Sequence, residues 1–342
     1  MNIYEESFFY KKILEYGLTP PTDITSNKAD AYNTFELIIN GKKREINAIS
    51  PKSDLYNIQK SLLDNFLTHI PLPNCVCGFI KGKSYLDFLE AHLKKEYYLR
   101  IDIKNFFPSL KAERVKETLS EYIKISNYTK KQEVLDNIVD IVTLNGSLPQ
   151  GAVTSPQLSN ILFRRLDIRI RNYCRKFNVD FTRYADDMLF SSNDDRLHKD
   201  FFVKMISKIL KDNQLVINRK KLRRGQKKIV LNGYVISNHI SLSRNKLKKV
   251  NSILYSFENI KGKKLEPKNF LEFYSRLSSN RSIFPDSSLT IEKKYDILFN
   301  YLAGYRSYLL SFSKEKHKDT CVDYSGKIKK LEYVLSKLNK WA

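Results

Sequence analysis

The sequence predicts an α+β fold in which antiparallel β-hairpins combine with amphipathic helices. Residues 179–191 form an alternating apolar and aromatic run with a tight tip at its centre. Residues 35–49 alternate around Asn40-Gly41, a dipeptide typical of two-residue hairpin turns. Apolar residues recur with helical spacing over 55–66, and the pattern after about residue 240 is mostly helical and basic. At 342 residues the chain is too long for one simple core, so we expect subdomains.

The other elements are predicted in chain order from the same periodicities. A strand that contains Asp102 should be closed by Pro108, and Ser155-Pro156 should open a helix with a cap and a first-turn proline. The remaining expected elements are an amphipathic segment at 8–18, helices at 84–94, 112–122, 132–142, 155–177 and 197–212, and a strand at 228–237.

The charge balance predicts a polyanionic partner. The chain has 60 Lys and Arg against 37 Asp and Glu, a net charge of +23, and the basic residues are spread along its whole length. A long groove that holds a nucleic acid duplex would need such a spread. We find no signal peptide and no apolar run of about 18 residues, so we expect no membrane segment. The four cysteines have no paired spacing, which favours structural thiols in a reducing cytoplasm.

Three acidic residues lie in strand-like surroundings. Asp186 and Asp187 occupy the hairpin tip between strands 179–184 and 188–191, and Asp102 lies in another strand. Adjacent carboxylates at a tight tip repel each other unless a cation compensates. Mg²⁺ is suitable because it binds one or two carboxylates together with substrate phosphates, and two-metal phosphoryl transfer needs carboxylates from more than one strand. The alternative is a solvated Asp-Asp turn, which the dipeptide alone does not exclude.

Further segments accompany these acids in a fixed order. They are Gly78–Ser84, Asp102, Leu148–Pro156, Tyr184-Ala185-Asp186-Asp187, Ile217–Lys221 and Leu231–Tyr234. In order and spacing this set resembles the reverse transcriptase family, and the resemblance covers about residues 40–240. Within the family the chain looks most like bacterial reverse transcriptases of the retron and phage-defence kind.

The resemblance implies a right-hand polymerase with fingers, a palm of antiparallel sheet backed by helices, and a helical thumb. The implied division is fingers and palm interleaved over 1–240 (fingers mainly 1–95 and 111–155, palm mainly 96–110 and 156–240), thumb over 241–315, and a basic C-terminal tail over 316–342.

The resemblance also implies a catalytic site. Asp102, Asp186 and Asp187 match the family's metal-binding triad for two Mg²⁺ ions, which Mn²⁺ can replace, and Ile103 joins them as a metal-site residue. Asp102 and Asp186 are the firmer ligands, whereas Asp187 is either a ligand, an outer ligand or a structural acid. The implied reaction is attack of a primer 3′-hydroxyl on the α-phosphate of a dNTP.

Four residues match the family's nucleotide-binding positions. Phe107 corresponds to the aromatic residue under the sugar that leaves no room for a 2′-hydroxyl, although it and Phe106 could both belong to the core. Because side chains alternate along a strand, at most one of the two can face the sugar. Gln150 and Gly151 resemble the loop beside the nucleotide, where a small residue lets the backbone approach the template base pair. Lys221 matches a lysine near the incoming nucleotide.

Contacts to nucleic acid are expected from basic residues and from two altered motifs. His92 is the residue kept from an Asn-Ala-x-x-His box, and Gly233 is the residue kept from a Val-Thr-Gly box, at positions where the family recognises its structured RNA. Arg183 could equally form a salt bridge to a neighbouring acid, and Lys81 and Lys83 could equally lie in a solvated basic loop. The candidates are Arg44, Lys81, Lys83, His92, Arg183, Gly233, Lys246, Lys248 and Lys249.

The resemblance implies partners as well as chemistry. They are a structured noncoding RNA as template and primer, dNTPs, a DNA product paired with RNA, and an effector protein encoded nearby, in the cytoplasm of a bacterium. The departures at Phe88–His92 and Leu231–Gly233 indicate a divergent retron or another defence-associated enzyme. The alternatives are a mobile-element or group II intron-like reverse transcriptase without a defence role, and an inactive RNA-binding protein with the same fold. An RNA-templated RNA polymerase shares the paired aspartates but often has a smaller or polar residue at the position of Phe107.

Overall fold

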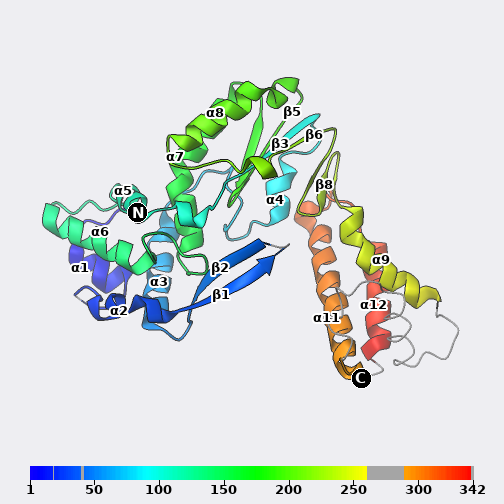
Figure 1. Cartoon of the computed structure of the whole chain (residues 1–342), viewed down its shortest axis with the longest axis horizontal. Coiled ribbons are helices and arrows are strands. Elements are labelled where there is room, and N and C mark those ends of the chain that lie inside the picture. Colours follow the sequence, from blue (N-terminus) through cyan, green and yellow to red (C-terminus); the bar gives the residue numbers. More distant parts are fainter. Residues whose placement is uncertain (18, 40–41, 260–288, 340–342) are drawn as a thin grey trace. The chain divides into compact units, whose positions relative to one another are not determined.

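A computed structural model describes residues 1–17, 19–39, 42–259 and 289–339 of the chain (Figure 1). The chain divides into two compact units, which are described here one at a time. Unit 1 comprises Met1–Ala91 and Glu96–Gln226, and unit 2 comprises His92–Lys95 and Lys227–Ala342. The division after Gln226 comes earlier than the expected boundary at 240, because the small sheet that follows it belongs with the C-terminal helices.

Unit 1 is built around an antiparallel sheet of four strands in the order β4-β5-β3-β6 (Figure 1). The strands are β3 (Tyr97–Asp102), β4 (Asp180–Tyr184), β5 (Asp187–Ser192) and β6 (Arg223–Gln226). The predicted hairpin at 179–191 is therefore confirmed as β4 and β5. Tyr184 lies opposite Asp187, so Asp187 is the first residue of β5 and the tip is formed by Ala185 and Asp186 alone. Ala185 has a φ of 54°, which allows the two-residue turn.

The strand that contains Asp102 is shorter than predicted. β3 ends at Asp102, and the chain then turns at Asn105, which has a φ of 50°. Pro108 lies inside the short 3₁₀-helix η4 (Phe107–Ser109) and does not close a strand. The expected alternation of Phe106 and Phe107 along a strand was therefore wrong, because neither residue belongs to one.

The helices of unit 1 surround this sheet. The predicted helices at 55–66, 112–122, 132–142, 155–177 and 197–212 are confirmed with shifted ends, and the helix expected at 84–94 is shorter and already ends at Glu90. A capping box joins Ser84 and Asp87 at the start of that helix. The α-helices are α1 (Glu6–Phe8), α2 (Thr22–Ser26), α3 (Asp54–Asn65), α4 (Tyr85–Glu90), α5 (Ala112–Leu119), α6 (Tyr128–Val142), α7 (Ser155–Arg175) and α8 (Asp200–Lys211). The N-terminal amphipathic segment continues from α1 into a π-helical turn, η1 (Phe9–Ile13).

Helix α7 is the central support of unit 1. It packs against β4, α5 and α8, and it begins at Ser155 with Pro156 in its first turn, as predicted. Its buried face carries Leu158, Ile161 and Leu162 into one continuous hydrophobic core that extends from Ile3 to Ile217. The free energy of burying this core holds α7 and the sheet together.

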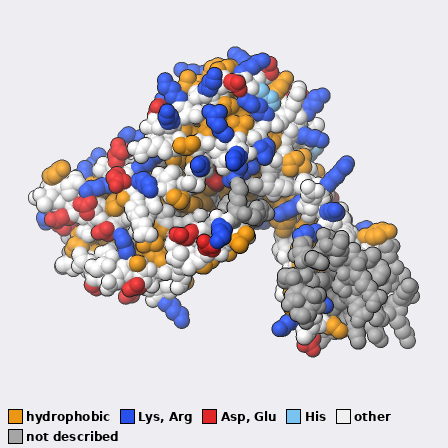
Figure 2. All heavy atoms as spheres, viewed as in Figure 1, with side chains coloured by type: hydrophobic (Ala, Val, Ile, Leu, Met, Phe, Trp, Pro, Cys, Tyr) orange, Lys and Arg blue, Asp and Glu red, His pale blue; other side chains and the backbone are white. Residues whose placement is uncertain are grey.

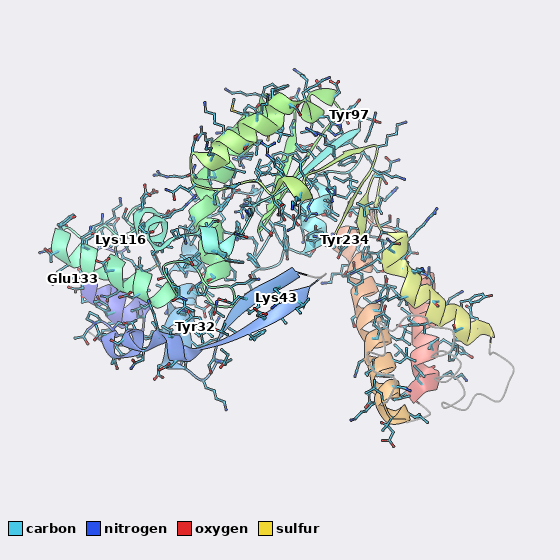
Figure 3. The ribbon with its side chains drawn as sticks, in the orientation of Figure 1. Tyr32, Lys43, Tyr97, Lys116, Glu133 and Tyr234 are labelled. Atoms are coloured by element: carbon cyan, nitrogen blue, oxygen red, sulfur yellow. The ribbon has the colours of Figure 1, made fainter. Side chains whose placement is uncertain are left out.

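A second, two-stranded sheet completes unit 1. β1 (Tyr32–Ile39) and β2 (Lys42–Ile49) pair in antiparallel register, which confirms the predicted hairpin, although Asn40-Gly41 lies outside the described residues. Figure 3 shows Tyr32 and Lys43 on these strands.

Unit 2 consists of a three-stranded antiparallel sheet and helices. Its strands are β7 (Ile229–Leu231), β8 (Tyr234–Ile236) and β9 (Ile240–Leu242), and its described α-helices are α9 (Arg244–Asn259), α11 (Ile291–Leu310) and α12 (Ser325–Asn339). The single strand predicted at 228–237 is in fact a hairpin, because Asn232 and Gly233 adopt φ angles of 50° and 89°.

The C-terminal segment is not a tail. Helix α12 packs against α9 and α11 through the buried side chains Ile328, Leu331 and Val334. The prediction of a separate basic tail over 316–342 was therefore wrong for the described part of that segment. In the described ranges, no helix combines the length and the apolar character needed to cross a membrane.

Candidate active site

The three predicted acids meet where β3, β5 and the β4–β5 tip come together. Asp102 is the last residue of β3 and lies directly opposite Asp187 of β5. The backbone carbonyl of Asp186 accepts a hydrogen bond of 3.0 Å from the amide of Ile103. This bond attaches the tip to the end of β3, so the fold brings Asp102, Ile103, Asp186 and Asp187 together as the sequence predicted.

Two cations accompany these carboxylates. Lys221, in the 3₁₀-turn η6 (Arg219–Lys221), donates from Nζ to Oδ2 of Asp102 at 2.6 Å. Arg100 donates from Nε and Nη2 to Oδ1 of Asp187, at 2.9 and 2.5 Å. Asp102 is 1% exposed, and its other oxygen, Oδ1, has no hydrogen-bond partner among the described residues.

A cavity of about 500 Å³ opens beside these groups within unit 1. It is lined by six of the predicted metal and nucleotide residues, which come from separate segments, together with polar and charged side chains that were not predicted. The predicted residues in its lining are Asp102, Ile103, Asp186, Phe107, Gln150 and Lys221, and the unpredicted polar ones include Lys43, Glu45, Asn47, Lys104, Asn105 and Asn218.

The electrostatics of the tip favour a cation. Burial raises the pKa of Asp186 to about 6, and the negative charges of Asp187 and Asp102 act in the same direction. A bound cation would relieve this repulsion, and the unpartnered oxygen of Asp102 is a ready ligand. Within the described residues, however, no three His, Cys, Asp or Glu side chains gather closely enough to hold a metal ion by themselves.

The predicted nucleotide-binding residues differ in their burial and in their packing partners. Phe107 is half-buried, with its ring centroid 5.3 Å from Phe106 and 6.4 Å from Phe79, whereas Phe106 packs into the core against Phe163. The carbonyl of Gln150 accepts from the amide of Asn47 at 2.9 Å.

Gly151 serves a structural purpose that differs from the expected one. It has a φ of 126°, and an added Cβ would lie 2.6 Å from the carbonyl oxygen of Asn47 in β2. The small residue therefore permits close approach to the β1–β2 hairpin, and its expected role beside a template base pair stays a prediction.

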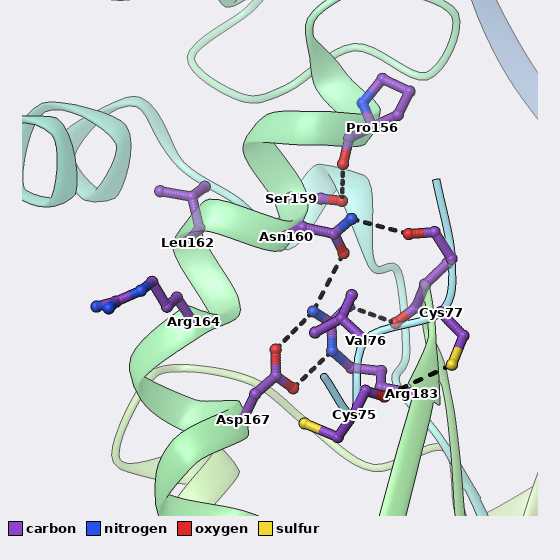
Figure 4. A network of polar contacts seen from close by, with 12 residues as sticks. Cys75, Val76, Cys77, Pro156, Ser159, Asn160, Leu162, Arg164, Asp167 and Arg183 are labelled. Carbon is purple, nitrogen blue, oxygen red and sulfur yellow. Dashed lines mark hydrogen bonds and ion pairs between the residues drawn. The ribbon is translucent and has the colours of Figure 1, made fainter. Parts of the chain in front are cut away.

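Arg183 is not available to nucleic acid. It is completely buried, and its guanidinium pairs with Asp167 of α7 through two contacts of 2.7 Å (Figure 4). It also donates to Asn160 at 3.1 Å and to the carbonyl of Ala185 at 3.1 Å. The prediction of a primer contact was wrong, because the salt bridge that we had considered as the alternative occupies this side chain inside the protein.

The same network holds a neighbouring segment against the tip. Asn160 donates to the carbonyl of Gly78 at 2.9 Å, and a Cβ added to Gly78 would lie 2.7 Å from the amide nitrogen of Ala185. The amides of Arg183 and Cys77 each bond to the other segment, so residues 75–77 run beside β4 like an additional strand.

The remaining fingers candidates lie in different settings. Lys81 is exposed, whereas Nζ of Lys83 donates to the carbonyls of Asn74 and Val76 at 3.0 and 2.8 Å. The side chain of Arg44 lies outside the described residues. Figure 2 shows Lys and Arg side chains scattered over much of the visible described surface of unit 1.

The candidates in unit 2 divide into buried and exposed residues. His92 is fully buried, and burial, with a smaller effect of Lys95, lowers the pKa of its ring to about 3. The prediction that this side chain contacts RNA was therefore wrong. Gly233 forms the β7–β8 turn, and a Cβ added to it would lie 3.0 Å from the side chain of Lys246.

Lys246, Lys248 and Lys249 follow on α9. Lys246 and Lys248 are exposed and Lys249 is partly exposed. Lys246 and Lys249 line a shallow cavity of about 590 Å³ together with Tyr301 and Tyr305 of α11.

Sequence reasoning missed Arg100, Asn160 and Asp167. Strand alternation places Arg100 on the same face as Asp102, two residues later, so the pattern contained a usable signal for Arg100. Asn160 and Asp167 lie on the buried face of α7, and nothing local in the sequence indicates that they pair with Arg183.

Comparison with known proteins identifies the family of the chain. Residues 34–236 match the family described as reverse transcriptase (RNA-dependent DNA polymerase). The retron Ec73 reverse transcriptase of Escherichia coli is 31% identical over 214 residues, which cover 58% of this chain and 68% of that protein. The retron Ec86 reverse transcriptase of Escherichia coli is 26% identical over 318 residues, covering 90% of this chain and 84% of that protein. Among solved structures, apo telomerase from Candida tropicalis aligns with 91% of this chain and 61% of its own, with a TM-score of 0.46 and 13% identity. The chain therefore belongs to the reverse transcriptase family, and it is an RNA-directed DNA polymerase of the bacterial retron type.

Proposed function

We propose that this enzyme copies a structured noncoding RNA into DNA at the cavity beside Asp102 and Asp186, with two Mg²⁺ ions, as part of an anti-phage defence system. The convergence of Asp102, Asp186 and Lys221 on one cavity carries the catalytic part of this proposal. Carboxylates, a lysine and aromatic residues that line one cavity are the groups expected at a catalytic site.

The residues present suit a divalent cation. Two carboxylates together with triphosphate oxygens match the preference of Mg²⁺ for few protein ligands, and Mn²⁺ accepts the same oxygen ligands. Asp102 and Asp186 would hold the ions, the backbone of Ile103 lies beside them, and Asp187 contributes negative charge. When bound, the ions would lower the pKa of the primer 3′-hydroxyl and neutralise charge on the triphosphate.

The chain's own residues would position the nucleotide. Lys221 is close enough to the acids to neutralise phosphate charge as the α-phosphate is attacked and pyrophosphate leaves. The half-buried ring of Phe107 would exclude a ribose 2′-hydroxyl by its bulk. Gln150 lines the same cavity and would contact the nucleotide from a backbone fixed by β2.

Replacing Asp186 with asparagine tests the catalytic site. Asp186→Asn removes a carboxylate from a site where burial and neighbouring charges raise its pKa, so the melting temperature should hold or rise. Primer extension with dNTPs on an RNA template should fall to background. A variant that extends the primer at a rate near that of the wild-type protein would contradict the proposed role of Asp186.

The RNA partner is proposed from charge and from the likeness to retron enzymes. The net charge of +23 and the exposed side chains of Lys81, Lys246 and Lys248 suit contacts to phosphates without reading sequence. An effector protein would respond to the DNA product or to the ribonucleoprotein, in the bacterial cytoplasm.

Sequencing of bound nucleic acid tests this part. The protein would be expressed with its native flanking DNA, and its bound RNA and newly made DNA would be sequenced, with Asp186→Asn as the matched control. One abundant small RNA with cDNA from a fixed interval, absent in the control, is the expected result. Random cellular RNAs with heterogeneous cDNA would indicate a mobile-element or general-purpose enzyme.

A further inference from the structure

The two acids at the end of the sheet, Asp102 and Asp187, lie in different surroundings although they are directly opposite each other. Asp102 lines the cavity and pairs with Lys221, whose side chain is 30% exposed. Asp187 is absent from the cavity lining and pairs with Arg100, and these two side chains are 15% and 10% exposed. Both side chains of the Arg100–Asp187 pair are therefore largely shielded from water, which limits how far solvent and salt weaken their attraction.

The sheet register fixes this pairing. Arg100 and Asp102 are two residues apart on β3, so their side chains leave the same face of the sheet. Asp187 is the cross-strand neighbour of Asp102, which makes Arg100 its diagonal neighbour, within reach of a long side chain. Both Arg100 donors converge on Oδ1 of Asp187, at 2.9 and 2.5 Å.

We propose that Arg100 is a positioning residue that keeps Asp187 out of the ion site. This inference rests on the proposed two-ion site. In the free protein Asp102 and Asp186 are the acids at this end of the sheet that line the cavity, and Arg100 neutralises Asp187 beside them. The ions therefore depend on nucleotide phosphates to complete their coordination, and their affinity for the free protein is low.

The inference is tested by binding of Mn²⁺ to the protein without nucleic acid or nucleotide, measured by electron paramagnetic resonance of the free ion. Asp186→Asn should weaken binding by about tenfold or more, as expected when a direct ligand is lost. Arg100→Gln frees a carboxylate and should tighten binding by about tenfold. Arg100→Lys, which keeps the charge, should bind Mn²⁺ like the wild-type protein.

The charge-balanced double variant Arg100→Gln with Asp187→Asn decides between the two roles of Asp187. It removes a neutral pair, so Mn²⁺ affinity should stay within about twofold of wild type. If the double variant binds as weakly as Asp186→Asn, or if Arg100→Gln alone does not tighten binding, Asp187 is a ligand in the free protein and the inference is wrong. If Asp186→Asn itself leaves Mn²⁺ affinity unchanged, the proposed ion site fails instead. Thermal melts of every variant establish that each is folded.

Discussion

Removal of Arg183 should destabilise unit 1 strongly, although the residue lies outside the catalytic cavity. Arg183 and Asp167 are both fully buried, and two contacts of 2.7 Å join them. Arg183→Met would leave the Asp167 carboxylate buried without its cation, and breaking such a pair from one side costs about 3–5 kcal/mol. The lost cation–π contact with Phe163, at 4.7 Å, acts in the same direction. For a unit of this size the loss corresponds to a melting temperature lowered by about 6–20 °C.

The assay is thermal and denaturant unfolding followed by circular dichroism. The double variant Arg183→Met with Asp167→Leu should recover much of the lost stability, because no buried charge remains unpaired. Lys60→Met, which breaks the exposed Lys60–Asp64 pair, is the matched control and should leave the unfolding midpoint unchanged. Unfolding of Arg183→Met at the wild-type midpoint would refute the reasoning that this buried pair supports the tip.

Two other predictions concern sugar selection and pH. Phe107→Val should admit ribonucleotides and lower the preference for dNTPs over NTPs by about 10–200-fold in competition assays. Phe106→Val should lower the melting temperature and keep the preference for dNTPs. If Phe106→Val instead loses the preference and Phe107→Val keeps it, Phe106 is the residue that selects the sugar. His92 is expected to stay neutral in the fold, since burial lowers its pKa from 6.5 to about 3. The unfolded chain therefore binds more protons, and stability should fall as pH drops below about 6.5, by about 1.4 kcal/mol per pH unit, in melts between pH 7 and 4.5. His92→Gln should remove that slope, and an unchanged slope would assign it to other groups.

Elements with strong local signals were predictable from the sequence. The hairpin that carries Asp186 and the helix that begins at Ser155-Pro156 follow from periodicity and capping, which depend only on near neighbours. The Asn232-Gly233 turn also had a local signal, but the apolar residues on both sides read as one continuous strand. Sequence reasoning could not find the pairing of Arg183 with Asp167, because the partners lie on a strand and a helix that only tertiary packing brings together. The burial of His92 could not be predicted for the same reason, because it depends on contacts that no local pattern encodes.

The contact between Gly78 and Ala185 has a consequence for attempts to re-engineer this polymerase. The turn that bears Asp186 packs against the backbone of Gly78, which has no side chain that could be shortened or enlarged. A methyl group added to Gly78 would lie 2.7 Å from the backbone nitrogen of Ala185. A side chain introduced at Gly78 would therefore have to displace the backbone of the turn. Gly82 is different, since a Cβ there would meet no atom of the described residues within 4 Å, although its φ of 80° still favours glycine. Probes, crosslinkers or short insertions around residues 81–82 should therefore leave the fold intact, whereas a side chain at Gly78 should not.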